Sequence, residues 1–439
     1  MSNDPGSTPG PDDDPSQGNP FKGTPFEQLF AGMAGGAMPD LGALFSQVQA
    51  LMQPHDGPVN WSVVTDIARR SAAQQPDPSA TQSQKAAVAD AVRLADHWLD
   101  ETTDFPSGVT STAAWSRAEW IVETTEVWKR LVEPIAGSAT TALAGALPEE
   151  ARAMAGPLLG MLAKATGAMV ATQVGQGIGG LAGEVLGASD IGLPLGPAGK
   201  AALLPANVDA FAADLDVPRD DVVLYLALRE AAHQRLFAHV PWLREHLLSA
   251  IADYGRGIEI NTSSMEDKLR QIDMTNPMAM QQAMEGGLFD LQRSPAQQAA
   301  LERLEVTLAL IEGWVDDVVG QATAERMPNA AKLQEIVRRR RAAGGPAEQT
   351  FASLVGLELR PRRLRDASTL WGSLRARQGT EGRDGVWMHP HLLPTAADLD
   401  DPLGFREDSV APESISDEDF EAGLRQLLDG PSDPDRPEE

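Results

Sequence analysis

The chain has 439 residues, 42% of them hydrophobic, and a formal net charge of −27 at pH 7. That length allows two or three domains of roughly 150 residues each, with enough apolar side chains to build a core. The chain has no cysteine, which excludes disulfides, thiolate ligands and cysteine nucleophiles, so any metal site must use histidine and carboxylate. The strong negative charge argues against general phosphate binding, and we expect no nucleic-acid partner.

The two ends of the chain differ in composition from its middle. Residues 1–24 are rich in Pro, Gly, Asp and Ser and are predicted to be a disordered leader. Residues 403–439 are predicted to be an acidic, disordered tail, which carries much of the negative charge. The leader contains no basic segment followed by an apolar stretch, which argues against a secretory signal and favours a cytoplasmic location.

The middle of the chain has the periodicity of helices. Short apolar patches in 25–60 predict short helical segments, and residues 61–402 are predicted to form one helical domain. Apolar residues recur there at intervals of three and four, as in the stretch 87–99 and again in 120–131. This spacing predicts an antiparallel bundle of amphipathic helices over the first part of the domain.

The chain has an Ala/Gly-rich stretch, Met154 to Gly187, whose longest uncharged part is almost long enough to span a bilayer. Its side chains are too small and too polar for that role, since Gln173 and Gln176 lie inside it. We therefore predict a closely packed core helix and no membrane association, with small residues on one face at Gly175, Gly179 and Gly183. A short β hairpin is predicted over Ile191–Pro205, where Gly196-Pro197 and Gly199 supply turn residues. The expected fold class is mainly α with this small β hairpin.

Two further helices frame a candidate site. Asp220–Ala252 is strongly periodic, and Pro241 is predicted to break or kink it, leaving a first helix over about 220–240. Leu301–Gly320 gives a second helix over about 301–320.

The first of these helices carries the run Arg229-Glu230-Ala231-Ala232-His233. Residues 229 and 233 share a helix face one turn apart. Zinc peptidases use this geometry, with histidines at i and i+4 binding the ion and a glutamate at i+1 polarising its water. Here Glu230 and His233 hold the second and third places, and Arg229 stands at the first. A lone Glu-x-x-His also fits a structural salt bridge or a cap, because it is common on helices.

The surroundings of this run resemble an actinobacterial zincin-like metallopeptidase family, with a degenerate His-Glu-x-x-His motif. The similarity covers the stretch Arg229–Leu247, with its Val-Pro-Trp-Leu-Arg segment, and Ile311–Val319, which resembles the family's Glu-Gly segment. It extends over roughly residues 61–402 in consistent order and spacing. The resemblance implies a zinc-dependent hydrolase with Glu230 as general base, and with His233 and Glu312 as zinc ligands.

Arg229 departs from the family pattern at the first ligand. A guanidinium stays protonated and offers no lone pair to zinc, so two ligands remain where a catalytic site usually has three. Rescue by His239 or His246 would need a sharp turn of the chain. Alternatively, Arg229 is expected to pair with an acid and replace the charge of the ion, with Glu230, Glu312 and Asp316 as the candidate partners.

Two functional hypotheses therefore remain: a zinc-dependent peptidase whose activity is weak or lost, and a non-catalytic scaffold that binds a peptide or protein partner. The Arg-rich run Arg338–Arg341 could suggest a nucleic-acid surface, but a solvated helix end or a contact with the acidic tail is favoured. His389 and His391 are predicted to be exposed loop residues. The tail carries a short helix-spaced apolar face that is predicted to fold against a groove or basic patch, at Phe420, Leu424, Leu427 and Leu428.

Overall fold

The computed structural model describes residues 57–145, 156–256, 294–344, 352 and 363–406. These residues belong to one compact unit, His55–Glu439, and they are mainly helical, which confirms the expected fold class. The predicted leader, nearly all of 25–60 and nearly all of the tail lie outside the described residues.

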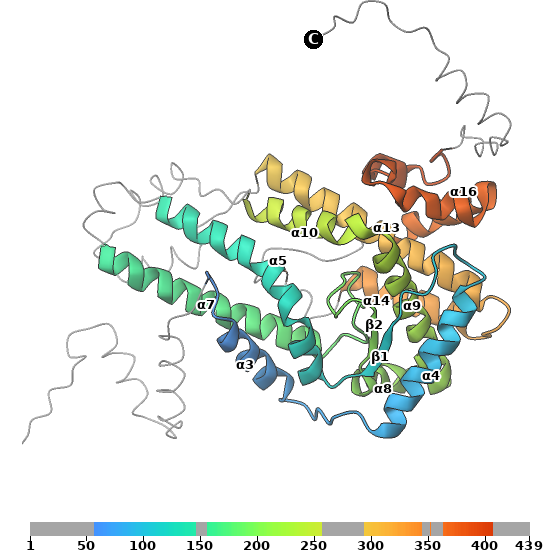
Figure 1. The fold of residues 1–439 in the computed structure, drawn as a ribbon, viewed down its shortest axis with the longest axis horizontal. Coiled ribbons are helices and arrows are strands. Elements are labelled where there is room, and N and C mark those ends of the chain that lie inside the picture. Colours follow the sequence, from blue (N-terminus) through green and yellow to red (C-terminus); the bar gives the residue numbers. More distant parts are fainter. Residues whose placement is uncertain (1–56, 146–155, 257–293, 345–351, 353–362, 407–439) are drawn as a thin grey trace, which may run out of the picture. The chain divides into compact units, whose positions relative to one another are not determined.

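The first helices form a group of three. They are α3 (Trp61–Ala72), α5 (Arg117–Gly145) and α7 (Gly156–Ala182), and each packs against the other two (Figure 1). A Cβ atom added at Gly175 would lie 2.8 Å from the Val64 carbonyl oxygen, and one at Gly179 would lie 2.6 Å from that of Ala68. The glycine face of α7 therefore lets its backbone approach α3 closely, as predicted for a packed core helix. None of the helices that the structure describes is long and apolar enough to cross a membrane.

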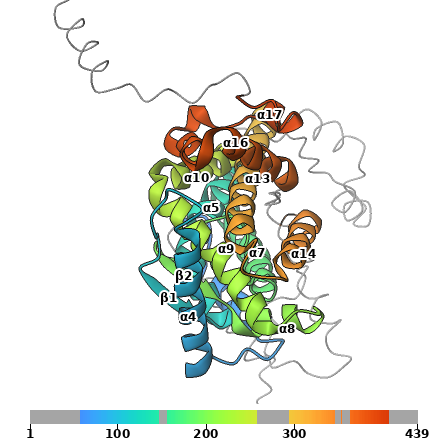
Figure 2. The ribbon, with the colours of Figure 1, turned by 90° about the vertical axis from the view of Figure 1, so that its right-hand side faces the viewer.

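A second group surrounds α9 (Arg219–His239). α4 (Gln82–Leu99) and α13 (Pro295–Thr323) pack against it, and α8 (Pro205–Ala213) and α14 (Ala330–Ala343) also contact it (Figures 1 and 2). α10 (Pro241–Arg256) starts at Pro241, immediately after α9, which confirms the predicted break. It packs on both α5 and α13 and so joins the two groups.

The C-terminal part of the described chain covers α13. α16 (Leu364–Gly385) packs along α13 and contains one non-helical residue, Gly379, whose φ of 74° requires glycine. It is followed by the 3-10 turns η1 (Val386–Met388) and η2 (Pro390–Leu392) and by the short helix α17 (Ala396–Asp400).

The predicted β hairpin over Ile191–Pro205 is wrong, although a small β element is present. β2 (Lys200–Leu203) pairs in parallel with β1 (Ser111–Ala114), so that Ser111 faces Lys200. A hairpin is antiparallel by construction, whereas a parallel pair needs a long crossover, here the chain of α5 and α7. The apolar residues before Gly196 form buried loop instead of a partner strand.

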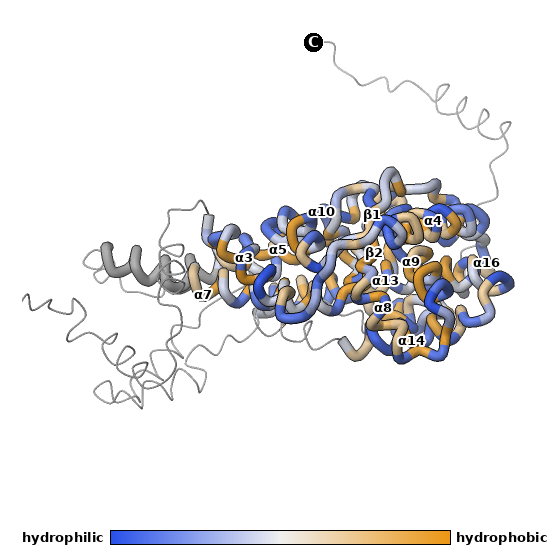
Figure 3. Tube along the Cα trace, turned by 90° about the horizontal axis from the view of Figure 1, so that it is seen from below, coloured by the Kyte–Doolittle hydropathy of each residue, from blue (hydrophilic) through white to orange (hydrophobic). Residues whose placement is uncertain are grey.

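α9 and α13 pack against each other in the core. Figure 3 shows hydrophobic stretches gathered along these helices, whereas the outer end of α16 is hydrophilic. Every residue of α9 from Tyr225 to Leu236 is buried, including five polar or charged ones. Charged side chains that are buried on a central helix require partners from neighbouring elements, because an unpaired buried charge is very unfavourable.

Candidate functional site

The motif residues lie in the interior of the second helix group. Arg229, Glu230 and His233 come from the centre of α9, and Glu312 comes from the middle of α13, which packs alongside. The exposed fraction is 6% for Arg229, 3% for Glu230, 2% for His233 and 0% for Glu312. The structure thus brings Arg229, His233 and Glu312 together, with Glu230 beside them on α9.

Glu312 is the centre of the cluster. Arg229 Nη2 donates to Glu312 Oε2 at 2.5 Å, and His233 Nε2 lies 3.1 Å from Glu312 Oε1. Arg341 Nε of α14 lies 3.8 Å from Oε2. Burial alone would raise the pKa of Glu312, but Arg341, Arg229 and His233 overcome it and hold that pKa at about 2. Glu312 is therefore ionised, with the two arginines at Oε2 and His233 at Oε1.

The hydrogen bonds of His233 determine which of its ring nitrogens carry protons. Nδ1 lies 2.8 Å from the carbonyl oxygen of Arg229, which can only accept, so Nδ1 donates. Nε2 lies 3.1 Å from Glu312 Oε1, so the ring nitrogen that could bind a metal is directed at this carboxylate.

Glu230 points to a different set of partners. Its carboxylate accepts from the Ser189 backbone N–H at 3.0 Å, from the Ser189 hydroxyl at 3.3 Å and from Gln234 Nε2 at 3.0 Å. Burial raises the pKa of Glu230, and His233 and these donors offset only part of that shift. The loop that precedes β2 therefore holds Glu230 away from the Arg229–Glu312 pair.

The arginine run of α14 completes the cluster. Arg338 Nη2 donates to Asp316 Oδ2 at 2.5 Å, and Arg340 Nη1 donates to Asp190 Oδ2 at 2.9 Å. Arg341 is 3% exposed and faces Glu312, whereas Arg339 alone in the run points to solvent. The interpretation of this run as a solvated helix end is thus wrong for three of the four arginines, whereas a contact with the tail lies outside the described residues.

These arginines also act on Asp190. Burial would raise the pKa of Asp190, but Arg340 and Arg341 lower it below its usual value. The cluster therefore joins α9, α13, α14 and the loop at Asp190 through alternating charges. One feature of the sequence indicates this arrangement, because Arg338 and Arg341 are three residues apart and so share a helix face.

The histidines considered as substitute ligands do not join the cluster. His239 is exposed at the end of α9 and stacks on Phe105, with ring centroids 6.1 Å apart. His246 lies in α10 and contacts Trp242. His389 and His391 are exposed and lie against each other, as the sequence predicted.

The residues present do not fit zinc. The first ligand position holds a guanidinium, which offers no lone pair and is bonded to Glu312, and the two remaining ligand candidates, His233 and Glu312, contact each other. Within the described ranges, no group of three or more His, Asp or Glu side chains is arranged to hold a metal ion. The cavity beside Arg229, Glu230 and His233 has a volume of about 20 Å³, which is room for roughly one water.

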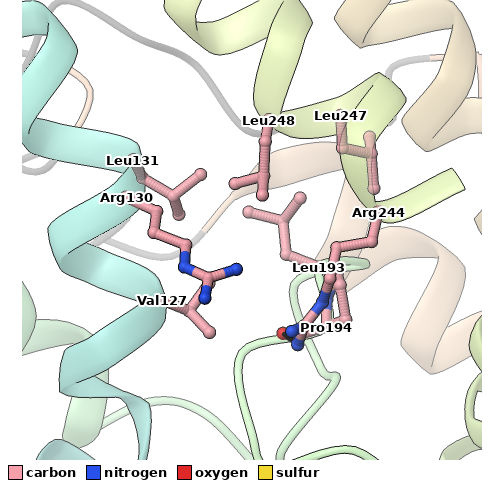
Figure 4. Close-up of a pocket in the computed structure, with 8 residues that line it drawn as sticks. All are labelled: Val127, Arg130, Leu131, Leu193, Pro194, Arg244, Leu247 and Leu248. Atoms are coloured by element: carbon pink, nitrogen blue, oxygen red, sulfur yellow. Dashed lines mark hydrogen bonds between the residues drawn. The ribbon is translucent and has the colours of Figure 1, made fainter. Parts of the chain in front are cut away.

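Two other hollows lie away from the cluster. Figure 4 shows a crevice between α5, α10 and the Leu193–Pro194 segment, into which Arg130 and Arg244 both extend. Burial, and then the charge of Arg130, lower the pKa of Arg244, which donates to the Pro194 carbonyl oxygen at 2.9 Å. This crevice has a volume of about 10 Å³, too small for an organic ligand. A groove of about 510 Å³ runs between α10, α13 and the segment 390–397.

The comparisons with known proteins agree with this architecture. A model of the zincin-like metallopeptidase family matches residues 59–405. A crystal structure of a candidate hydrolase with a novel fold, from Chloroflexus aurantiacus, superimposes with a TM-score of 0.55 at 19% sequence identity. The match covers 78% of this chain and 96% of that one, and at this identity it shows a shared fold only. No curated protein matches significantly.

Proposed function

We propose that this chain, which belongs to the zincin-like metallopeptidase family, is a non-catalytic member that binds no zinc and acts by binding a peptide or a partner protein. The observation that carries the proposal is the bond between Arg229 Nη2 and Glu312 Oε2 at 2.5 Å. The arginine stands where the family motif has its first histidine, and its charge takes the place of the charge of an ion. The site then contributes to the stability of the fold.

The burial of the cluster supports the same conclusion. A peptidase must bring a scissile bond to its general base, and Glu230 is 3% exposed and bonded to Ser189 and Gln234. A cavity of about 20 Å³ beside Glu230 leaves no room for a peptide. The residues of the motif are thus retained in a closed interior.

Binding is assigned to the groove between α10, α13 and residues 390–397. Its volume of about 510 Å³ lies within the range of roughly 300–1,000 Å³ that is usual for ligand sites. Its lining is mainly apolar and includes five polar or charged residues: His246, Glu302, Arg303, Thr307 and Thr395. This composition suits an apolar peptide segment.

Metal analysis of the purified full-length protein tests the zinc half of the proposal. Wild-type protein that has been incubated with zinc and then desalted should hold well under one zinc per chain, because the carboxylate and the histidine are already committed to each other. The same preparation should not cleave an unfolded protein substrate. Stoichiometric zinc that is lost in the variant His233→Ala would refute the proposal.

The variant Arg229→His is the matched gain-of-site control. It places a histidine one helical turn before His233 and frees one oxygen of Glu312. The new histidine, His233 and Glu312 then provide three ligands. We expect this variant to retain more zinc than the wild type, with Arg229→Gln at the wild-type level. Equal zinc content in Arg229→His and Arg229→Gln would show that residue 229 does not decide metal binding.

A further inference from the structure

The groove between α10 and α13 is open and mainly apolar. The apolar part of its lining comes from α13 and from the chain that follows η2, at Ala299, Val306, Leu310, Leu393, Pro394 and Ala397. Val306 and Leu393 are half-buried, and Ala299 is exposed. These side chains offer a surface against which an amphipathic helix can pack.

Exposed apolar side chains are concentrated on the same part of the chain. Among the side chains that the structure describes, six large hydrophobic ones are exposed, and three of them lie between residues 388 and 403: Met388 at 80%, Leu392 at 39% and Leu403 at 61%. Leu392 directly precedes groove residue Leu393. Clustered exposed apolar surface is typical of interaction sites on soluble proteins.

The described chain ends beside this groove. Arg406 Nη2 donates to the carbonyl oxygen of Leu392 at 3.3 Å, and Arg377 donates to the carbonyl oxygens of Phe405 and Arg406 at 2.7 and 3.1 Å. Residues 407–439 therefore continue from a point fixed against the groove wall. The ten residues 407–416 can span at most about 36 Å, so the segment after them can reach the groove.

That segment has start and stop signals for one short helix. Ser416 and Asp419 have the spacing of a capping box, and Ile415 and Phe420 have the spacing of a hydrophobic staple. Gly430-Pro431 supplies a stop signal. These signals indicate a helix over about 417–428.

The helix would carry a narrow apolar face between acidic residues. Its apolar positions recur at i, i+4, i+7 and i+8, namely Phe420, Leu424, Leu427 and Leu428. An isolated helix of this length is marginal in water, so the apolar face needs a surface to cover it.

We propose that the groove binds this C-terminal segment, residues 415–428, of the same chain. The apolar face of the segment packs on Ala299, Val306 and Leu393, and its acidic face remains toward solvent and Arg303, which also pairs with Asp253. The short tether gives the segment an effective concentration in the millimolar range, so even a weak contact keeps the groove occupied. This inference rests on the binding half of the proposed function and is independent of Arg229.

Hydrogen–deuterium exchange on full-length variants tests the contact from both sides. In the wild type, the amides of 417–428 should exchange at least tenfold more slowly than in the double variant Phe420→Asp/Leu424→Asp. Ala299→Glu, an exposed substitution on the groove face of α13, should release the same amides although the tail is unchanged. Val306→Asp provides a second groove variant, and Val122→Asp, on an exposed apolar residue of α5, is the control that should leave the tail protected.

A fluorescent peptide of residues 414–430 provides the binding measurement. It should bind the full-length Phe420→Asp/Leu424→Asp variant at least tenfold more tightly than the wild type, whose groove is already filled, and Ala299→Glu should weaken that binding. Equal binding to both proteins, or no binding to either, would overturn the proposal. Concentration-dependent dimerisation that is abolished by Phe420→Asp/Leu424→Asp would overturn it as well, because the occupant would then be a second copy. Zinc content is a separate measurement, so failure here leaves the metal conclusion standing.

Discussion

Arg229 Nη2 lies 2.5 Å from Glu312 Oε2 in the interior of the protein, where neither residue is more than 6% exposed. The two residues come from helices α9 and α13, 83 positions apart in the chain. Burial acts to lower the pKa of Arg229, but the Glu312 charge raises it, so the guanidinium is charged. The pair therefore connects the two central helices, because the buried charge on each helix is compensated by the charge on the other.

Replacing Glu312 with Gln should destabilise the fold by about 3 kcal/mol. The change leaves Arg229 and Arg341 buried without a full compensating charge, and removing one partner of a buried pair typically costs about 3–5 kcal/mol. Denaturant unfolding measures the change. The control is Glu302→Gln, at an exposed position of the same helix, which should shift stability by less than about 0.5 kcal/mol. Equal effects of the two substitutions would show that the cluster contributes no stability.

The same cluster predicts how stability depends on pH. The pKa of Glu312 falls from 4.5 to about 2 on folding, so its contribution is fully present above pH 4.5 and is lost as the pH falls toward 2. The pKa of Asp190 is lowered as well and acts in the same direction. Unfolding free energy measured between pH 5 and pH 2.5 should fall more steeply for the wild type than for Glu312→Gln. Parallel curves would contradict the depressed pKa.

Glu230 should show the opposite behaviour. Burial raises the pKa of Glu230 above its ordinary value of 4.5. At a pH just above 4.5 the folded state therefore keeps a proton that the unfolded state releases. Stability contributed by this group is present below pH 4.5 and declines as the pH rises through the folded pKa. Glu230→Gln should therefore become more stable relative to the wild type as the pH rises from 4.5 to 7. Circular-dichroism melts across that range would test this, and a constant difference would refute it.

Local signals in the sequence predict where helices begin and end more accurately than they predict which helices contact each other. Pro241 marked the end of α9, and the helical spacing marked α13, because backbone sterics and amphipathic patterns act over a few residues. The motif spacing also identified Glu230 and His233 as neighbours on one helix. For Arg229 the sequence leaves three candidate partners, of which Glu312 is one. The packing of α9 on α13 determines that Glu312 is the residue that Arg229 contacts.

The misses depend on contacts between distant segments. Lys200–Leu203 lies within the hairpin predicted over Ile191–Pro205, but its partner strand is Ser111–Ala114, and no local turn signal specifies a parallel pair. Arg341 was expected at a solvated helix end because arginine is mostly exposed. It lies inside because α14 packs near α9 and α13, where Glu312 is available.

The glycine face of α7 predicts a pair of opposite mutational effects. Gly175→Ala should destabilise the fold by about 1–3 kcal/mol, because the new methyl group would lie 2.8 Å from both the Val64 carbonyl oxygen and Ile67 Cβ. Gly137→Ala in α5 should instead stabilise by up to about 1 kcal/mol, since nothing lies within 4 Å of its Cβ and alanine favours helix. Thermal melts of both variants would reveal the contrast. Stabilisation by both would mean that α7 and α3 do not approach closely.

A double-mutant cycle can measure the Arg229–Glu312 interaction itself. Arg229→Met keeps most of the side-chain volume and removes one cation, while His233 and Arg341 remain near Glu312. Glu312→Gln removes the anion. The double variant removes both charges of the pair, so neither charge is left buried without its partner. The sum of the two single losses should therefore exceed the loss in the double variant by at least about 1 kcal/mol. Additive losses would show that the two charges do not stabilise each other, despite their contact at 2.5 Å.

Arg339→Met with Glu312→Gln is the reference cycle, because Arg339 is exposed on the same arginine run and pairs with Glu335. Its losses should add within about 0.5 kcal/mol.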